Sequence, residues 1–76
     1  MIEIVVHNCS CKEKELLVDR FLYHEVIKFD ANNFKVIVNI DPDELDEVGA
    51  ILMDNEVSYI NLESLADSII EITLEE

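Results

Sequence analysis

The seven residues from 34 to 40 constrain the fold of this chain more than any other segment, because their side chains alternate in character. Phe34, Val36, Val38 and Ile40 fall on one side of an extended chain, and the residues between them fall on the other. A period of two is typical of a β-strand with one buried face. The run Asp-Ala-Asn-Asn at residues 30–33 is a turn candidate, since Asn tolerates positive φ. We therefore predict a hairpin with a second strand over residues 25–30.

Capping residues indicate where two helices begin. Ser10 is a candidate N-cap, and Glu13 three residues later completes a capping box for a helix that runs toward residue 24. At residues 41–44, Asp41 occupies the cap, Pro42 the first helical position and Glu44 the third. This second helix is predicted to reach about residue 55. Its sheet-facing side comprises Leu45, Val48, Leu52 and Gly49, the last of which allows close approach to the sheet.

Further secondary structure is predicted at the two ends of the chain. The C-terminal segment fits both the period of a strand and the period of a helix. Residues 2–7 are rich in β-branched side chains and predict a first strand, and residues 57–61 predict a short strand after the second helix. Ile70, Ile72 and Leu74 alternate with polar residues, as they would in a strand. The polar residues over 62–75 also gather in one compact arc, as they would on a helix. We prefer the helix and retain the strand as the alternative.

These elements predict a small α+β sandwich of ferredoxin-like order, β-α-β-β-α-β, with an extra C-terminal helix or strand. The 76 residues suffice for a single acidic domain over residues 1–76. One Gly and one Pro leave little material for long loops, and an apolar fraction of 50% argues against disorder.

The acidic residues are distributed unevenly along the chain. The formal net charge is −13, yet residues 1–35 hold six acids and five bases. Residues 36–76 hold the other twelve acids and no Lys or Arg. A field of this sign repels phosphate backbones and anionic membranes and attracts basic partners. It also opposes folding through self-repulsion, so we expect a basic partner that compensates for it.

The leading functional hypothesis is therefore a small acidic protein-binding module that engages a basic, nucleic-acid-binding surface of a partner protein. Its sharpest form is nucleic-acid mimicry, in which carboxylates replace phosphates and inhibit the partner. Small phage-encoded inhibitors of host defence or host transcription often have this size and charge, and an anti-host or anti-defence role is the narrowest form of the hypothesis. The predicted partner-binding residues around the second helix are Asp41, Asp43, Glu44, Asp46, Glu47, Asp54 and Glu56. A second row, if the terminus is helical, comprises Glu63, Asp67, Glu71 and Glu75.

The same composition predicts where the protein does not act. We expect no direct nucleic-acid binding and no membrane association. No segment resembles a signal peptide, because the first residues lack a basic region and Glu3 interrupts their apolar run. We expect a cytoplasmic protein. A homo-oligomer that buries apolar surface between subunits is a further alternative.

A cluster of His7, Cys9 and Cys11 at the junction of the first strand and helix is the main alternative site. Cys11 would lie at the first position of a helix, where the helix dipole lowers the pKa of a thiol. The segment from residue 2 to residue 30 resembles the opening of a thioredoxin or glutaredoxin domain, which implies a thiol-redox role. This chain has Cys-Ser-Cys where that family has Cys-x-x-Cys, and Pro42, its only Pro, is placed to begin a helix.

A metal-binding version of this alternative would use the same residues. His7, Cys9 and Cys11 supply three ligands and His24 a fourth, whereas a structural zinc site usually takes four. We therefore predict neither a metal nor another cofactor. We also predict no enzymatic activity, since the chain offers no set of nucleophile, base and orienting group.

Overall fold

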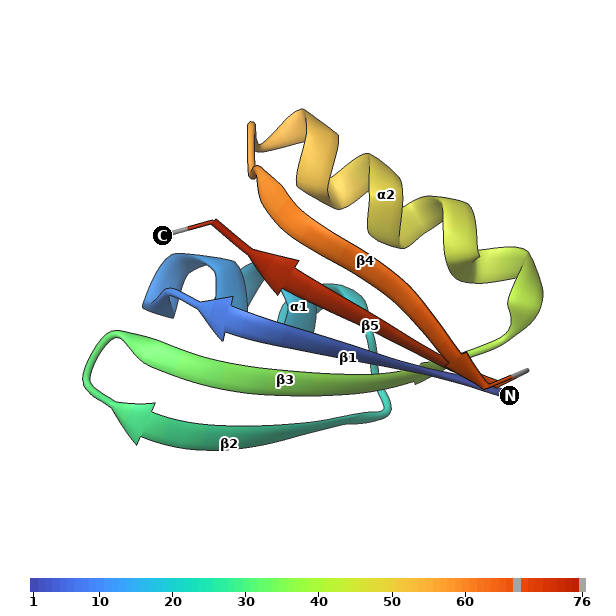
Figure 1. Ribbon diagram of the computed structural model, residues 1–76, viewed down its shortest axis with the longest axis horizontal. Coiled ribbons are helices and arrows are strands. Elements are labelled where there is room, and N and C mark those ends of the chain that lie inside the picture. The colour runs from blue at the N-terminus through green and yellow to red at the C-terminus, as the bar shows by residue number, and fades with distance from the viewer. Residues whose placement is uncertain (67, 76) are drawn as a thin grey trace.

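Five strands and two helices make up the part of the chain that the computed structural model describes, residues 1–66 and 68–75. In chain order they are β1 (Ile2–Cys9), α1 (Cys11–Arg20), β2 (His24–Asp30), β3 (Asn33–Ile40), the 3-10 turn η1 (Pro42–Glu44), α2 (Leu45–Asp54), β4 (Tyr59–Ala66) and β5 (Ile69–Leu74). Figure 1 shows the strands as one twisted sheet beside the two helices. The predicted α+β class is confirmed.

The sheet is mixed and has the order β2-β3-β1-β5-β4. β1 pairs antiparallel with β3 and parallel with β5, so it is the central strand. The hairpins β2–β3 and β4–β5 extend the sheet on either side of β1. β2 and β4 are therefore the two edge strands. The predicted ferredoxin-like arrangement is not confirmed, because the last strand, β5, lies between β1 and β4 in the sheet.

Local signals in the sequence account for most of the observed element boundaries. The predicted hairpin is present, with Val26 opposite Val36. The first capping box is also present, since the Ser10 N–H donates to the Glu13 carboxylate at 2.8 Å and the Glu13 N–H donates to the Ser10 hydroxyl at 3.2 Å. At the second helix start, the Asp41 N–H donates to the Glu44 carboxylate at 3.2 Å, and one 3-10 turn precedes α2.

The preference for a C-terminal helix is wrong, and the strand alternative is correct. Residues 59–66 and 69–74 form an antiparallel hairpin. The period of two places Ile72 and Leu74 in the core, where they are 4% and 0% exposed. β5 supplies the second hydrogen-bonding partner that the central strand requires on its other side.

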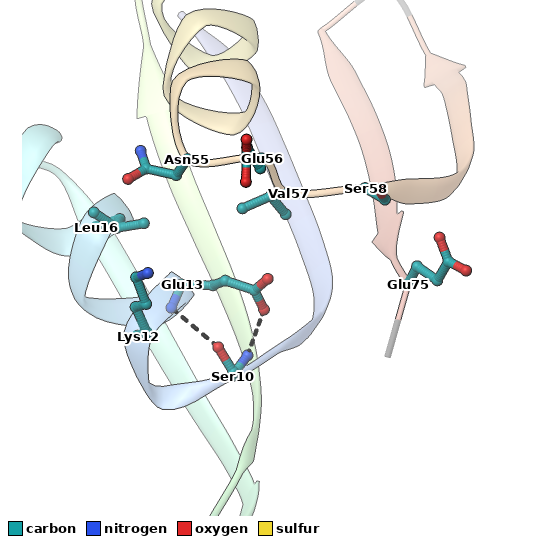
Figure 2. Close-up of a pocket in the computed structure, with 9 residues that line it drawn as sticks. All are labelled: Ser10, Lys12, Glu13, Leu16, Asn55, Glu56, Val57, Ser58 and Glu75. Carbon is teal, nitrogen blue, oxygen red and sulfur yellow. Dashed lines mark hydrogen bonds between the residues drawn. The ribbon is translucent and has the colours of Figure 1, made fainter.

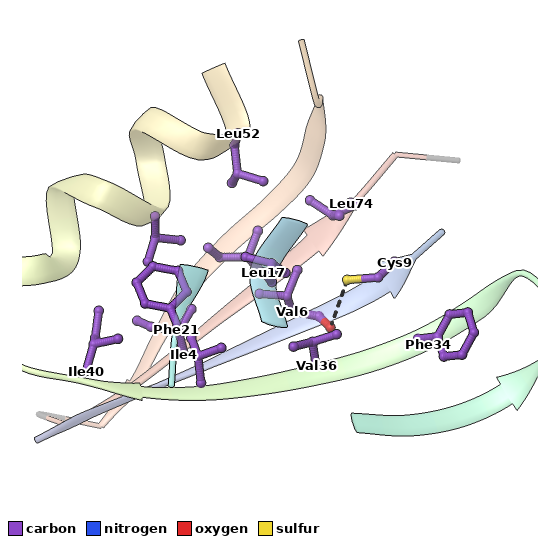
Figure 3. Close-up of a cluster of buried hydrophobic side chains, with 13 residues drawn as sticks. Ile4, Val6, Cys9, Leu17, Phe21, Phe34, Val36, Ile40, Leu52 and Leu74 are labelled. Atoms are coloured by element: carbon purple, nitrogen blue, oxygen red, sulfur yellow. Dashed lines mark hydrogen bonds between the residues drawn. The ribbon is translucent and has the colours of Figure 1, made fainter. Parts of the chain in front are cut away.

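A single cluster of apolar side chains fills the space between the sheet and the helices (Figure 3). β1 and β3 supply the floor of the cluster, including Ile4, Val6 and Val36, none of which is exposed. The helices contribute one face each, mainly Leu17 from α1 and Leu52 from α2. No buried polar or charged residue occurs among the described side chains. All of the described charge therefore lies outside this core.

Gly49 does not have the predicted role. Val48 and Leu52 are buried as expected, whereas Leu45 is 38% exposed. A Cβ added at Gly49 would meet nothing within 4 Å, and its φ is not positive. α2 therefore leaves an open space beside Gly49 and does not approach the sheet closely there.

We predict that Gly49→Ala stabilises the protein by about 0.5–1 kcal/mol, because Ala restricts the unfolded chain without meeting a neighbour. Urea denaturation of the two proteins measures the difference in unfolding free energy. The exposed helical residue Ala50 serves as the control, and Ala50→Gly should destabilise α2 by a similar amount. A destabilising Gly49→Ala would show that the helix approaches another group at this position.

Candidate protein-interaction surface

The outer side of α2 carries the first group of predicted carboxylates. Asp46 and Asp54 are exposed, and Asp43 is exposed in the 3-10 turn that precedes the helix. At 100° per residue, Asp46 and Asp54 lie on the side of α2 away from the buried Val48 and Leu52. A rigid helix thus presents these carboxylates to solvent. The two further predicted residues at its start differ in exposure, because Asp41 is exposed and Glu44 is half-buried.

Two predicted carboxylates lie close to side chains from residues 1–35, the half of the chain in which acids and bases nearly balance. A Glu47 carboxylate oxygen lies 2.8 Å from an Arg20 guanidinium nitrogen, which joins α2 to α1. A Glu71 carboxylate oxygen lies 3.2 Å from Nε2 of His7 on the neighbouring strand β1. No other ion pair is found over residues 1–66 and 68–75. The remaining described acids of the second half therefore have no basic side chain within ion-pair distance.

The second group of predicted carboxylates does not line one side of a helix, because the C-terminal segment is a β-hairpin. Glu63 and Glu71 are direct cross-strand partners in β4 and β5, on the sheet face away from the helices. Like charges in this arrangement oppose strand pairing. Glu75 is exposed just after β5, and Asp67 lies outside the described residues. The juxtaposed pair is thus a feature that folding does not favour.

Glu56 has an unusual backbone for its residue type. The N–H of Glu56 donates to the carbonyl of Met53 at 3.1 Å, and the N–H of Val57 donates to that of Leu52 at 2.8 Å. These two bonds define a Schellman motif at the end of α2, in which Glu56 occupies the left-handed position that usually takes glycine. Its φ is 55°. The exposed carboxylate is therefore held at some cost in backbone energy.

Glu56 also lines a shallow hollow of about 290 Å³ between the start of α1 and the end of α2. Figure 2 shows that Glu13, Glu56 and Glu75 contribute three carboxylates to this hollow, together with the amino group of Lys12. The Glu13 carboxylate is already bonded to the Ser10 N–H, which is its capping role. No pattern in the sequence indicates this grouping, because Glu13 lies in residues 1–35 and comes close to Glu75 only in the folded chain.

We predict that Glu56→Gly raises the unfolding free energy by about 1 kcal/mol, since glycine adopts positive φ without a steric penalty. The same change should weaken any interaction that uses this carboxylate. Thermal or urea unfolding measures the first effect. Glu56→Gln separates the two contributions, because it removes the charge and keeps the backbone penalty. A Glu56→Gly protein no more stable than Glu56→Gln would contradict the assignment of backbone strain.

The two cysteines have different environments, and the cluster at residues 7–11 is not assembled into one site. Cys9 is 0% exposed and its thiol donates to the Val6 carbonyl at 3.7 Å, whereas Cys11 is exposed. Burial, and then the neighbouring Glu13 carboxylate, raise the pKa of the Cys9 thiol to about 12. Such a thiol is protonated and a poor nucleophile at neutral pH. His7 points to the opposite sheet face, toward Glu71.

His24 is also distant from this junction. It begins β2 opposite Val38, whose partner on β1 is Ile4. The Nδ1 atom of His24 lies 2.8 Å from the Phe21 carbonyl oxygen. Within the described residues, no group of three or more His, Cys, Asp or Glu side chains is placed to hold a metal ion. The four candidate ligands are therefore not brought together.

We predict that iodoacetamide adds one alkyl group to the native protein, at Cys11, and two in denaturant. The raised pKa and burial of Cys9 keep its thiol protonated and enclosed until the fold opens. Mass spectrometry of intact protein and peptides reads the outcome. Cys11→Ser is the control and should show no native labelling. Rapid labelling of Cys9 in the native Cys11→Ser protein would contradict its burial.

Comparisons with known proteins do not extend this description. No protein-family model matches the chain, and neither a curated protein nor a solved structure shows significant similarity to it. No helix in the described part of the chain is long and apolar enough to cross a membrane. The fold and surface thus define a small α+β domain with a strongly acidic second half.

Proposed function

We propose that this protein is an acidic binding module that engages a basic, nucleic-acid-binding surface of a partner protein. Its carboxylates would occupy positions where that partner otherwise meets phosphate groups. The observation that carries the proposal is the excess of unpaired carboxylates in residues 36–76, where among the described acids only Glu47 contacts an Arg and only Glu71 contacts a histidine ring. Oppositely charged surfaces steer association and form charge-assisted hydrogen bonds to Arg.

Acids that act against folding support this interpretation over solubility alone. Glu56 occupies a glycine position, and Glu63 lies directly opposite Glu71. Solubility would be served equally well by carboxylates at unstrained, well-separated positions. A binding role accounts for charge at these particular places, because a partner's cations would relieve the repulsion between Glu63 and Glu71.

The positions of these acids suit a large, flat partner surface better than a small ligand. Asp46 and Asp54 project from the outer side of α2, while Glu63 and Glu71 lie on the uncovered sheet face. Helices and strands hold their side chains in fixed relative positions, which favours complementarity to an ordered row of Arg and Lys. Inhibition of a nucleic-acid-binding protein is the function that this arrangement supports best. The thiol alternative receives no comparable support, since Cys9 is enclosed in the core.

The proposal is tested by capturing partners from a cell lysate on the immobilised protein and measuring each purified partner by fluorescence anisotropy. We expect nucleic-acid-binding proteins whose affinity falls at least tenfold between about 0.05 and 0.5 M salt, because screening weakens charge attraction. A duplex DNA oligonucleotide should compete for the same partner. Affinity that is insensitive to both salt and DNA would overturn the proposal.

We predict that Asp46→Asn/Asp54→Asn lowers the affinity for such a partner about fivefold at low salt, since each exposed charge contributes about 0.5 kcal/mol. The matched control is Glu15→Gln/Asp19→Asn, which removes two exposed acids from α1 in the balanced half. The control should change affinity less than twofold. Urea denaturation of both variants checks that the fold is retained. Equal losses in the two variants would show that net charge, and not the α2 surface, determines binding.

A further inference from the structure

An apolar groove runs between α2 and the β4–β5 hairpin. It has a volume of about 300 Å³, and its walls are Leu45, Val48, Gly49, Leu52, Met53, Val57, Tyr59, Leu62, Ile70 and Ile72. Four of these side chains are substantially exposed: Leu45 at 38%, Met53 at 80%, Tyr59 at 53% and Leu62 at 55%. The open space beside Gly49 belongs to the same groove. Contiguous exposed apolar surface of this kind marks an interaction site.

The groove lies beside a free edge of the sheet. β4 is the last strand in the order β2-β3-β1-β5-β4, so its outer side has no neighbouring strand in the described chain. In Figure 1, α2 lies alongside β4 over much of the strand's length. An added strand at this edge would place every second side chain on the helix side, next to Tyr59 and Leu62. The remaining side chains would fall on the opposite face.

The two faces at this edge differ in chemistry. The helix side is the apolar groove, whereas the opposite side carries Glu63 with Glu71 beside it. The sequence around the edge contains no Lys or Arg, since residues 36–76 have none. A second copy of this chain would bring its own acids to this edge, and like charges would oppose the contact. Charge complementarity therefore favours a basic occupant.

We propose that the β4 edge and its groove bind an extended segment of the partner in which apolar and basic residues alternate. The segment would pair with residues 61–63 as an added strand, insert its apolar side chains beside Met53 and Leu62, and direct its Lys or Arg side chains toward Glu63. Main-chain hydrogen bonds supply affinity in this mode of recognition, and alternate side chains supply specificity. The inference rests on the proposed function, because it names the part of the basic partner that this surface recognises.

The other sheet edge lacks this combination. β2 carries Lys28 on its helix-facing side, opposite Phe34, and belongs to the balanced half of the chain. It nevertheless has exposed apolar neighbours, Leu22 at 82% and Phe29 at 63%. These exposures match those of Met53 and Leu62 closely, so the β2 edge is an internal control for nonspecific apolar binding.

The probe is a labelled synthetic peptide of alternating Val and Lys, measured by fluorescence anisotropy. Met53→Ser/Leu62→Ser should weaken its binding about tenfold or more, because two apolar contacts are lost. Leu22→Ser/Phe29→Ser should change it less than twofold. A peptide of the same composition with its Lys residues in one block should bind at least tenfold more weakly. Hydrogen exchange should slow at residues 61–63 when the alternating peptide is bound. Equal effects of the two double variants, or equal binding of the two peptides, would overturn the inference.

Three further measurements distinguish a failure of the edge inference from a failure of the proposed function. Replacing Lys by Gln in the alternating peptide should lower its affinity at low salt and remove its salt dependence. If the Gln peptide binds as tightly, the groove is an apolar site and the edge inference is overturned, whereas the proposed acidic function is overturned only if binding of a captured partner is insensitive to salt. If the groove variants have no effect while binding of a captured partner still depends on salt, only the edge inference is overturned. Sedimentation that reveals a dimer abolished by Met53→Ser/Leu62→Ser would assign the groove to a second copy and would also overturn it.

Discussion

The pairing of β1 with both β3 and β5 is the interaction on which the rest of this structure depends. β1 brings the two hairpins into one sheet, and its inward residues Ile4 and Val6 are fully buried beneath the helices. A central strand must satisfy its backbone N–H and C=O groups on both sides, since water does not reach them. The parallel contact with β5 joins residues far apart in sequence, so the fold requires the C-terminal hairpin to be in place.

This dependence explains which elements were predictable from the sequence. The β2–β3 hairpin and the two helix starts are specified locally, by alternation around Val36 and by capping residues such as Ser10. The C-terminal segment satisfies helical and extended periods at once, and its state is decided by a distant strand. The same limit applies to Gly49, whose role depends on the distance between α2 and the sheet, and to Glu63 and Glu71, which become neighbours only after the hairpin forms. The acidic residues of α2 could thus be placed from the sequence, whereas the cross-strand pair of Glu63 and Glu71 could not.

The structure also changes how the acidic half is understood. Glu47 and Glu71 were both predicted to bind a partner, yet Glu47 lies against Arg20 and Glu71 against His7. Exposed pairs of this kind contribute little to stability, typically about 0–1 kcal/mol. They nevertheless distinguish paired carboxylates from unpaired ones such as Asp46 and Asp54. The surface proposed to bind a partner is thus smaller than the count of acids suggests, and it is concentrated on α2 and the β4–β5 hairpin.

Residues 36–76 combine most of the negative charge of the chain with its most open packing. A domain of this size buries only about 60% of its unfolded surface, so exposed apolar residues and self-repulsion are both difficult to tolerate. α1 closes over β1 and β3, whereas α2 leaves Met53 and Leu62 accessible beside an unpaired strand edge. In the proposed binding mode, an edge that is apolar on one side and acidic on the other would be protected from its own copies by charge and open to a basic strand. Repulsion that weakens the isolated fold would then serve as the source of its selectivity.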